Sequence, residues 1–460
     1  MYLTSLYIII EVKSDSYYGN SNKIRITCFL AEFLYERKYF MVYVISKDNK
    51  PLMPCTNVIA RLLLKQGKAK VKEKCPFTIK LNYETTEYTQ ELTLGVDTGS
   101  SHVGVAVSDN IGKIYYISDV EIRNDISDKM TQRSKYRRNR RTRKTRYRKA
   151  RWLNRKNSIK KDRFSPTMIS KINSHIKEIE YAKSILPIHN LVLETGTFDT
   201  HLMKNPDLYN PKYRHWGYQQ GANYGFENTK AKVLNRDNYT CQCCKGKRKD
   251  SKLEVHHIIY RCNGGSDEEE NLITLCHSCH FDLHHDKLKL KLNGKRKSQL
   301  KHATQMNSIR VQLLKIYSEA IETFGCITKA NRLLHNIDKE HYLDACVIAS
   351  NGKQINIITD NLYKKKCISK GDYQRSKGIR SEQKIPTCKI CGFRKFDKVR
   401  YFGKEYFIKG RMSSGYCILM DIEGNKIDFS CMPKGYKTPK LSNCKRIQAR
   451  TSQMVERIVI

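Results

Sequence analysis

The stretch ELTLGVDTGSSHVGVAVSDNIGKIYYISDVEI, residues 91–122, decides the fold of this chain. Apolar residues and glycine alternate with polar residues through it, which predicts consecutive strands of a hairpin or meander. The first predicted strand ends in Asp97 and is followed by Thr-Gly-Ser-Ser. One acidic residue at a strand end is ordinary, so its meaning depends on which other acids the chain brings to it.

Two further carboxylates stand in comparable places. Glu194 ends the apolar strand NLVLE, and Asp344 lies in EHYLDA, three residues after His341 and on the same helical face. Carboxylates at the ends of adjacent strands, with another on a facing helix, can hold two divalent ions about 4 Å apart for phosphodiester hydrolysis. Because the three segments are far apart in the chain, their convergence requires one split RNase H-like domain.

The composition points to a polyanionic partner. Lys and Arg total 86 and Asp and Glu total 45 in 460 residues, a formal net charge of +41. Such a field favours nucleic acid, although a ribosome-associated or merely soluble basic protein would share it. No apolar run approaches the roughly 18 residues of a membrane helix. The first residues also lack a basic leader and cleavage site, so we expect a cytoplasmic protein.

The 17 cysteines form an irregular set that indicates reduced thiols and metal sites rather than a disulfide framework. Cys241-x2-Cys244 and Cys276-x2-Cys279 predict a structural zinc ion held by four thiolates. Cys243 could replace a neighbour, but the spacing favours the two outer residues. Paired CxxC motifs alone would also fit a zinc-ribbon binding module.

Between the cysteine pairs lies LEVHHIIYRCNGGSDEEENLITLCHSCH, which contains His256, His257 and Asn271. The order His, Asn, His within a zinc-stapled ββα unit resembles the HNH endonuclease family. The resemblance implies that His256 and His280 bind the catalytic Mg²⁺ and that His257 is the general base for the attacking water. It also implies that Asn271 fixes the loop of His257 through backbone hydrogen bonds.

The residues leave the metal ligands of this unit open. Many relatives have aspartate where His256 stands, which leaves the preferred metal open. His277, His284 and His285 are nearby competitors, and His280 is preferred because the resemblance aligns it.

The run KYRRNRRTRKTRYRKARW contains no Pro or Gly, which predicts a long basic helix. Guanidinium groups bind phosphate bidentately, and the interleaved aromatic residues can stack on bases. A solvated basic tail or a localisation signal is the alternative. The candidate contacts are Arg137, Arg138, Arg140, Arg141, Arg143, Arg146 and Arg148.

The acidic segments, RRNRR (137–141), KPLMP (50–54) and an HNH unit inserted before the third segment together resemble IscB, transposon-encoded RNA-guided nucleases related to type II CRISPR effectors. The resemblance covers the chain from about residue 41 to its end. It implies an α/β fold: a split RuvC-like, RNase H-like domain with an inserted zinc-stapled ββα HNH domain, a long basic bridge helix and a small C-terminal β-barrel-like domain.

The expected divisions follow this resemblance. In chain order they are an extension outside the family (1–40), a PLMP-type domain (41–90), RuvC-like segment I (91–126), the bridge helix (127–163), segment II with a connector (164–225), the HNH domain (226–290), segment III (291–365) and a domain that contacts RNA and a target motif (366–460). The extension is expected to reflect an upstream start codon chosen in error, or else to pack on the first domain.

The C-terminal region offers two weaker expectations. Lys398, Arg400 and Lys409 are plausible contacts to the target motif. Cys388-x2-Cys391 could belong to a second zinc site, but no second pair is evident.

The resemblance implies an RNA-guided DNA endonuclease. The HNH site would cut the guide-paired strand, and Asp97, Glu194, His341 and Asp344 would form the RuvC-like site for the displaced strand. Mg²⁺ or Mn²⁺ would serve both sites, and the partners would be a structured omega-type guide RNA and double-stranded DNA with a short flanking motif. We expect a monomer of prokaryotic, phage or mobile-element origin. The alternatives are a protein-guided HNH enzyme of the homing or restriction kind and a non-catalytic RNA-binding protein.

Overall fold

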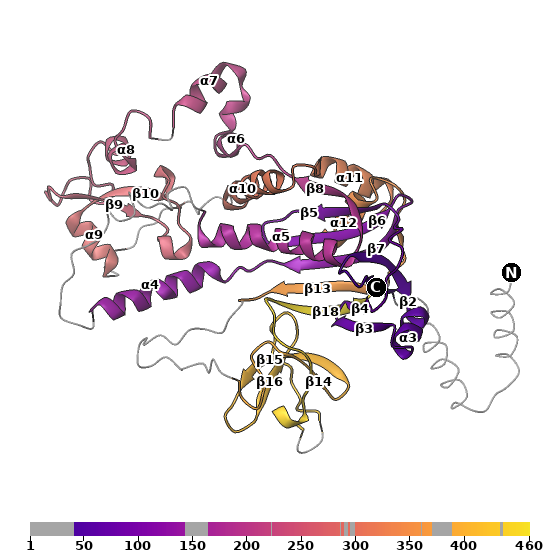
Figure 1. Cartoon of the computed structure of the whole chain (residues 1–460). Helices are drawn as coiled ribbons and strands as arrows, with labels where there is room; N and C mark the ends of the chain where they lie inside the picture. Colours follow the sequence, from indigo (N-terminus) through magenta and orange to yellow (C-terminus); the bar gives the residue numbers. More distant parts are fainter. Residues whose placement is uncertain are drawn as a thin grey trace, which may run out of the picture. The chain divides into compact units, whose positions relative to one another are not determined.

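The computed structural model describes residues 41–142, 164–221, 223–285, 287–288, 293–294, 300–359, 361–369, 389–432 and 436–460 (Figure 1). The expected extension, residues 1–40, lies outside them. The chain forms two compact units, Met1–Thr195 with Gln312–Ile460, and Gly196–Val311. The connector that sequence reasoning placed with segment II therefore belongs, from Gly196 onward, to the unit that holds the HNH motif.

The first unit begins with a four-stranded sheet. Its order is β2-β1-β4-β3. Ala60 on the helix packs with Val42, Val44 and Ile79 of the strands to form a small core. The elements are β1 (Met41–Ile45), β2 (Pro51–Thr56), α3 (Asn57–Lys65), β3 (Ala69–Lys74) and β4 (Phe77–Leu81).

A larger mixed sheet of eight strands has the order β11-β8-β5-β6-β7-β13-β18, with β12 paired to β7. The predicted meander forms β5 to β7, and β8 lies parallel to β5. The strands are β5 (Leu92–Asp97), β6 (His102–Asp109), β7 (Lys113–Glu121), β8 (Ile188–Thr195), β11 (Ile321–Phe324), β12 (Asn356–Ile357), β13 (Asn361–Cys367) and β18 (Gln453–Val459).

Helices α5 (Pro166–Ile185) and α12 (His341–Ala349) cover opposite faces of this sheet. Lys365 pairs with Glu178 of α5 at 2.7 Å and lies over the Tyr116 ring. The next residue, Ile117, packs with Ala345 of α12, because neighbouring strand residues face opposite sides.

Two glycines let α12 lie directly on the strands. A Cβ at Gly95 would collide with the backbone of Ala349, and one at Gly104 with the carbonyl of His341. This close approach brings the first turn of α12, with His341 and Asp344, to the end of β5, where Asp97 lies.

Two further helices belong to this region of the chain. α11 (Gly325–Leu334) lies between β11 and α12, and α4 (Ile126–Thr142) begins the arginine-rich run. The remainder of the expected bridge helix, from residue 143 to 163, lies outside the described residues.

The C-terminal strands form an open four-stranded antiparallel sheet in the described residues, in the order β16-β15-β14-β17. Within the described strands, β16 and β17 are the two edges and do not pair with each other, so this sheet differs from the closed barrel that we expected. Val399, Tyr401, Ile408, Leu419 and Phe429 make its core. The elements are β14 (Lys398–Tyr401), β15 (Lys404–Arg411), β16 (Cys417–Met420), η5 (Leu441–Asn443) and β17 (Lys445–Gln448).

The structure also places the last strand and the three basic residues expected to contact the target motif. The division 366–460 stays a prediction, and its last strand, β18, pairs with β13 in the larger sheet. Lys398 is only 3% exposed and pairs with Glu405 at 2.7 Å, so it is not a free contact. Arg400 is exposed and lies near Glu405, and Lys409 donates to the carbonyl of Gly424.

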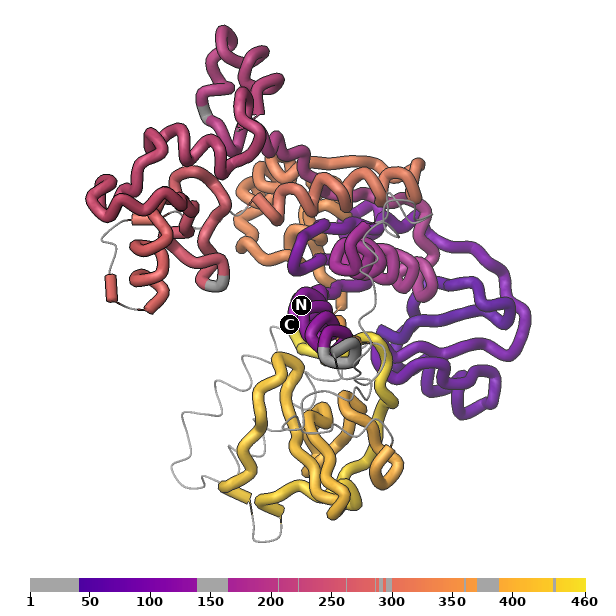
Figure 2. The backbone as a smooth tube through the Cα atoms, turned by 90° about the vertical axis from the view of Figure 1, so that its left-hand side faces the viewer, coloured from indigo at the N-terminus to yellow at the C-terminus, as the bar shows by residue number. Residues whose placement is uncertain are grey.

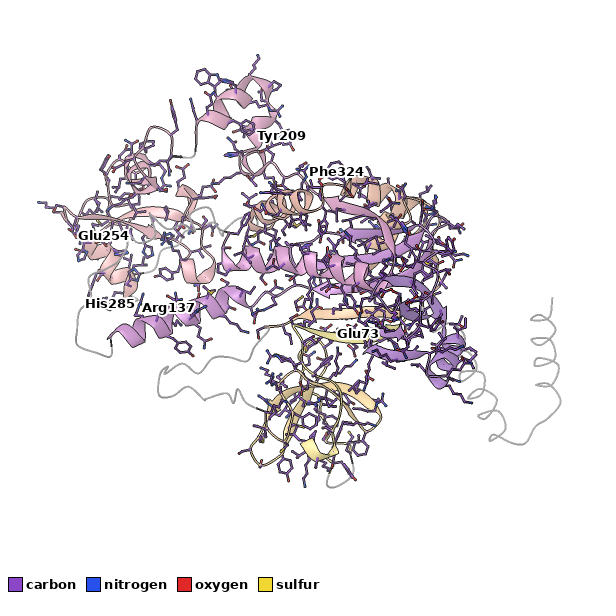
Figure 3. All side chains as sticks on the ribbon, in the orientation of Figure 1. Glu73, Arg137, Tyr209, Glu254, His285 and Phe324 are labelled. Atoms are coloured by element: carbon purple, nitrogen blue, oxygen red, sulfur yellow. The ribbon has the colours of Figure 1, made fainter. Side chains whose placement is uncertain are left out.

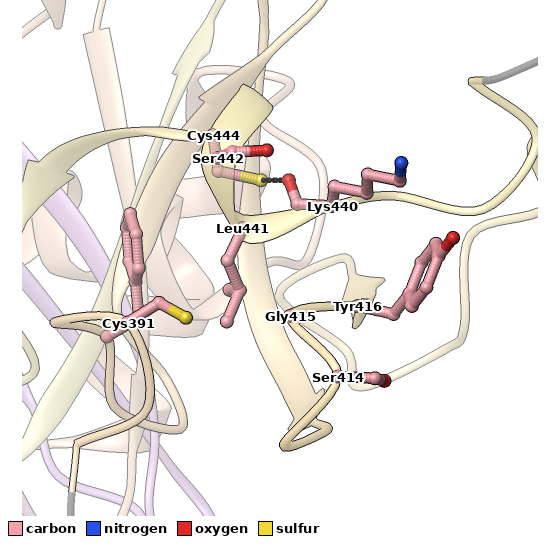
Figure 4. Close-up of a pocket in the computed structure, with 9 residues that line it drawn as sticks. Cys391, Ser414, Gly415, Tyr416, Lys440, Leu441, Ser442 and Cys444 are labelled. Atoms are coloured by element: carbon pink, nitrogen blue, oxygen red, sulfur yellow. Dashed lines mark hydrogen bonds between the residues drawn. The ribbon is translucent and has the colours of Figure 1, made fainter.

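A pocket of about 420 Å³ opens beside this sheet (Figure 4) and is lined by residues that include Cys391, Tyr416, Lys440 and Cys444. Cys388 lies outside the described residues. Within them, Cys391 joins no group of three or more metal ligands.

The second unit contains the predicted ββα element: β9 and β10 pair antiparallel, and α9 follows directly. No helix in the described residues is long and apolar enough to cross a membrane. The unit's elements are α6 (Thr200–Lys204), η2 (Pro206–Tyr209), α7 (Pro211–Gln219), α8 (Thr229–Arg236), β9 (Leu253–His257), η3 (Arg261–Asn263), η4 (Glu269–Asn271), β10 (Leu272–Cys276), α9 (His277–His284) and most of α10 (Leu300–Ile316).

Candidate active site

The four predicted zinc cysteines meet at one point. The sulfur atoms of Cys241, Cys244, Cys276 and Cys279 all lie within 4.8 Å of one another. A backbone hydrogen bond from Arg248 lowers the pKa of the Cys244 thiol to about 6, whereas burial raises the pKa of Cys276 and Cys279. Four thiolates this close repel one another unless a cation compensates them. The donor set therefore fits a structural zinc ion.

Cys279→Ser should remove the zinc and destabilise the Gly196–Val311 unit, because a structural zinc of this kind supplies about 10 kcal/mol of folding free energy. Metal analysis and limited proteolysis of the full chain would measure both effects. Cys243→Ser is the matched control, since Cys243 lies beside the cluster but outside it. Full zinc content in Cys279→Ser would remove that residue from the ligand set.

A second group of potential ligands consists of His256 on β9 with His280 and His284 on α9. Their ligand nitrogens also lie within 4.8 Å of one another. Burial, and then the two neighbouring imidazoles, lower the pKa of His256 to about 4, which keeps the ring in its neutral, metal-binding form. The structure thus brings together both predicted ligands and adds His284, whose i, i+4 spacing from His280 was the available signal.

Glu254 orients this group. Its Oε2 lies 2.6 Å from Nδ1 of His280, and Nε2 of His280 lies 3.2 Å from Nε2 of His284. A carboxylate on one nitrogen fixes the ring and turns the other nitrogen toward a metal. The competitors His277 and His285 stay outside the group: the first contacts Glu254 at 3.3 Å and the second packs on Phe281.

His257 faces away from its neighbour His256, because adjacent strand residues alternate. Its Nε2 lies 2.8 Å from Oδ1 of Asp267, which also accepts from Nε of Arg261 at 2.6 Å. Neither Asp267 nor Arg261 was singled out from the sequence. The adjacent histidines therefore occupy two different environments, one among imidazoles and one beside a carboxylate.

Asn271 ties together the loop that follows β9. It is fully buried, accepts a hydrogen bond from the Ile259 amide at 2.9 Å, and donates to the carbonyls of Ile259 and Ser266 at 3.0 and 2.8 Å. Asn271 thus makes hydrogen bonds to the backbone, as the family resemblance implies. They hold both ends of the segment 259–266, and Asp267 follows it directly.

In the first unit, Asp97 and Glu194 are register partners on the parallel strands β5 and β8. Burial, together with the negative charges of Asp97 and Asp344, raises the pKa of Glu194 to about 7, although the hydrogen bond from Thr328 lowers it. Burial also raises the pKa of Asp344, again with a contribution from Asp97. Three acids from distant segments thus share one electrostatic site.

Three neighbours hold these acids. Nδ1 of His341 lies 2.6 Å from Oδ2 of Asp97, and this hydrogen bond raises the pKa of His341. On α11, Thr328 donates to Glu194, and Nε of Arg332 lies 3.2 Å from Oδ1 of Asp344. Sequence reasoning missed both α11 residues, because that helix carries no motif.

Carboxylates that lie close together repel one another, and this repulsion raises their pKa values. Divalent cations bind such groups and neutralise their charge. In the described residues, the three carboxylates are not gathered within 4.8 Å as the cysteines and histidines are. One ion therefore does not reach all three in this arrangement, whereas two ions about 4 Å apart could share them.

The arginine candidates are described only in part. Arg137, which Figure 3 labels, and Arg138 are both exposed on α4. Arg140 and Arg141 continue the helix, without described side chains. Arg143, Arg146 and Arg148 lie outside the described residues.

Two regions of the chain match known protein families. Residues 42–221 match the family described as RRXRR protein, and residues 241–286 match the HNH endonuclease family. Anaredoxin of Nostoc sp. (strain PCC 7120 / SAG 25.82 / UTEX 2576) is 37% identical over 70 residues, 15% of this chain and 90% of that protein. The type IV methyl-directed restriction enzyme EcoKMcrA of Escherichia coli (strain K12) is 37% identical over 65 residues, 13% of this chain and 23% of that protein.

Among solved structures, Streptococcus thermophilus Cas9 in complex with the AGAA PAM gives a TM-score of 0.30 at 11% identity, over 53% of this chain and 32% of that one. The chain thus spans about a third of that protein and about a quarter of the restriction enzyme. The two family matches follow one another along the chain, and the second contains the cysteine and histidine groups. With an RRXRR region followed by an HNH domain, the chain belongs to the IscB-like nucleases, and its HNH domain makes it a metal-dependent DNA endonuclease.

Proposed function

We propose that the protein is an RNA-guided DNA endonuclease with two catalytic centres, one for each strand of its target. One observation carries this proposal: a single chain holds two separate sets of nuclease donor groups, the three histidines around His256 and the acids Asp97, Glu194 and Asp344. A protein that cuts by one centre would need only one set. The assignment of the HNH centre to the guide-paired strand comes from the family resemblance.

In the HNH centre, His257 is the group that accepts a proton from the attacking water. Asp267 at Nε2 keeps the ring proton on that nitrogen, so Nδ1 carries the free lone pair. Asn271 holds the loop that positions this pair. A divalent ion held by His256, His280 and His284 would supply charge stabilisation at the phosphate.

In the acidic centre, Asp97, Glu194 and Asp344 would hold the divalent ions that stabilise the developing phosphate charge. His341 bonds Asp97 through Nδ1, which leaves Nε2 to exchange a proton with water or a leaving group. Thr328 and Arg332 orient the other two carboxylates. Loss of any acid would therefore disturb a shared site rather than a single contact.

The three-imidazole group should prefer Mn²⁺ or another transition-metal ion over Mg²⁺, because Mg²⁺ favours oxygen ligands and imidazole suits softer ions. We expect His256→Asp to shift cutting of the guide-paired strand toward Mg²⁺. Electron paramagnetic resonance of bound Mn²⁺ gives a second readout, with His280→Ala as the variant that lacks the site. Equal support by Mg²⁺ and Mn²⁺ in the unmodified protein would contradict this preference.

Arg137→Gln with Arg138→Gln should weaken RNA binding and lower the magnitude of the slope of log affinity against log salt by about 1 to 2. Each phosphate contact releases about one counterion when RNA binds, and the variant would lose two such contacts. Glutamine keeps the helix propensity while removing the charge. Lys70→Gln with Lys72→Gln, two exposed lysines of β3, is the matched control. An unchanged slope in the arginine variant would mean that α4 does not contact phosphates.

Sequencing the RNA that co-purifies with the full chain tests the function as a whole. Its guide segment would then be rewritten to match a chosen duplex, which the complex should cut at the new site. Specific cutting by RNA-free protein would favour a protein-guided endonuclease. Binding of RNA without cutting in either case would favour a non-catalytic RNA-binding protein.

A further inference from the structure

The connector before the HNH element carries a pocket that neither catalytic centre uses. It has a volume of about 340 Å³ and lies wholly within residues 205–220 of the second unit. Figures 1 and 2 show α6 and α7 standing apart from the ββα element of the same unit. We call this pocket the connector cup, and its lining includes Asn205, Leu208, Asn210, Tyr213, Trp216 and Gln220.

Two Asn-Pro pairs build the cup. Asn205 accepts a hydrogen bond from the amide of Asp207 and caps η2, and Asn210 accepts one from the amide of Lys212 and caps α7. A Cβ at Gly217 would collide with the side chain of Leu208, which is itself buried. The two short helices are therefore pressed together, and the floor of the cup is fixed by local contacts.

The rim of the cup is aromatic and exposed. Tyr213 is 62% and Trp216 63% exposed. Tyr209, which Figure 3 labels, ends η2 and is also exposed. Among the described side chains of residues 205–220, Leu208 is the buried one, whereas Tyr213 and Trp216 keep more than half of their surface in water. Several aromatic side chains exposed together around a pocket are typical of a binding surface.

The chemistry of the cup selects among partners. Side-chain amides of Asn205, Asn210 and Gln220 line it, and amides can pair with the edge of a nucleobase. Lys212 and Arg214 are exposed on α7 beside the lining, which contains the acid Asp207, and Lys204 is exposed but pairs with Glu268 at 3.7 Å. An apolar peptide would leave the amides unpaired, and the bases of an intact duplex are already stacked and paired.

We propose that the connector cup binds an unpaired nucleobase of a single-stranded nucleic acid, which stacks on Trp216 and Tyr213 while the basic residues contact the flanking phosphates. The proposal deepens the proposed function, because guided strand exchange leaves a displaced DNA strand and unpaired guide RNA. Both the DNA strand and the RNA present unpaired bases, and an experiment can distinguish them.

Tryptophan fluorescence provides a direct probe, because the chain has two tryptophans, Trp152 and Trp216. In the full chain with Trp152→Phe, Trp216 is the only reporter, and a base stacked on it should quench its emission. Single-stranded DNA, single-stranded RNA and blunt duplex DNA of one sequence would be titrated separately. We expect quenching by a single strand and not by the duplex. Quenching by DNA alone would indicate the displaced strand, and quenching by RNA alone the guide.

Trp216→Ala and Tyr213→Ala should each lower single-strand affinity about tenfold, with the salt slope unchanged because stacking releases no counterions. Tyr224→Ala, a residue 65% exposed on the same connector but outside the cup, should bind as the unmodified protein does. Retained zinc would show that the second unit is folded. Unchanged affinity in both cup variants, or quenching by the duplex as strong as by single strands, would overturn the proposal. Because these titrations need neither guide nor cleavage, failure of the RNA-guided function would leave them unaffected.

Discussion

His257→Ala should leave a protein that cuts only the displaced strand of its target. Removing a general base costs about 10²- to 10⁴-fold in rate. In the described residues, His257 is the histidine that contacts Asp267. The acidic centre lies in a separate unit of the chain, so its strand should be cut at the unmodified rate. A target duplex labelled differently on its two strands measures both rates in one reaction.

His285→Ala is the control for this change. His285 follows α9 and packs on Phe281, outside the group formed by His256, His280 and His284. It should leave both strands cut normally. If His257→Ala also left both strands cut, or stopped both while zinc was retained, His257 would not be the base of a strand-specific centre.

Asp97→Asn should produce the opposite nickase, one that cuts only the guide-paired strand. Asparagine keeps the shape of the side chain but removes the charge that divalent ions require, and such ions supply several kcal/mol of transition-state stabilisation. We expect a loss of at least about a hundredfold in cutting of the displaced strand, which corresponds to about 3 kcal/mol. The same labelled duplex reports it.

Glu91→Gln serves as the control for Asp97→Asn, since Glu91 is an exposed acid one residue before β5. It should cut both strands as the unmodified protein does. Undiminished cutting of the displaced strand by Asp97→Asn would exclude Asp97 from the centre, even if Glu194 and Asp344 remained candidates.

Local patterns predicted those parts of the structure that depend on local geometry. CxxC spacing identified the four clustered cysteines, and Asp97 and Glu194 could be paired because each ends an apolar strand. The placement of Asp344 followed from one helix facing those strands. The cysteines followed from their spacing alone, whereas the three acids were grouped only because the combined pattern fits a two-metal site.

Long-range pairings could not be predicted in the same way. Nothing in QMVERIV indicates that it joins β13 rather than the neighbouring C-terminal strands. Thr328 and Arg332 reach the acids from a helix without a signature, and Asp267 meets His257 across a loop. The spacing of His284 from His280 could have identified His284 as a metal ligand. That His256 is buried against both of them is a property of the folded unit.

Because β18 returns to the larger sheet, the C-terminal sheet is an insertion between β13 and β18 that could be replaced as a unit. Cys367 and Gln453 are direct register partners, and the amide of Ile368 donates to the carbonyl of Ser452 at 2.9 Å. The chain therefore departs and comes back at adjacent positions about 5 Å apart, a gap that a two-residue turn can bridge. A relative's module could be spliced between these points without breaking the sheet, whereas simple truncation after β13 would strip away β18 and expose an edge strand.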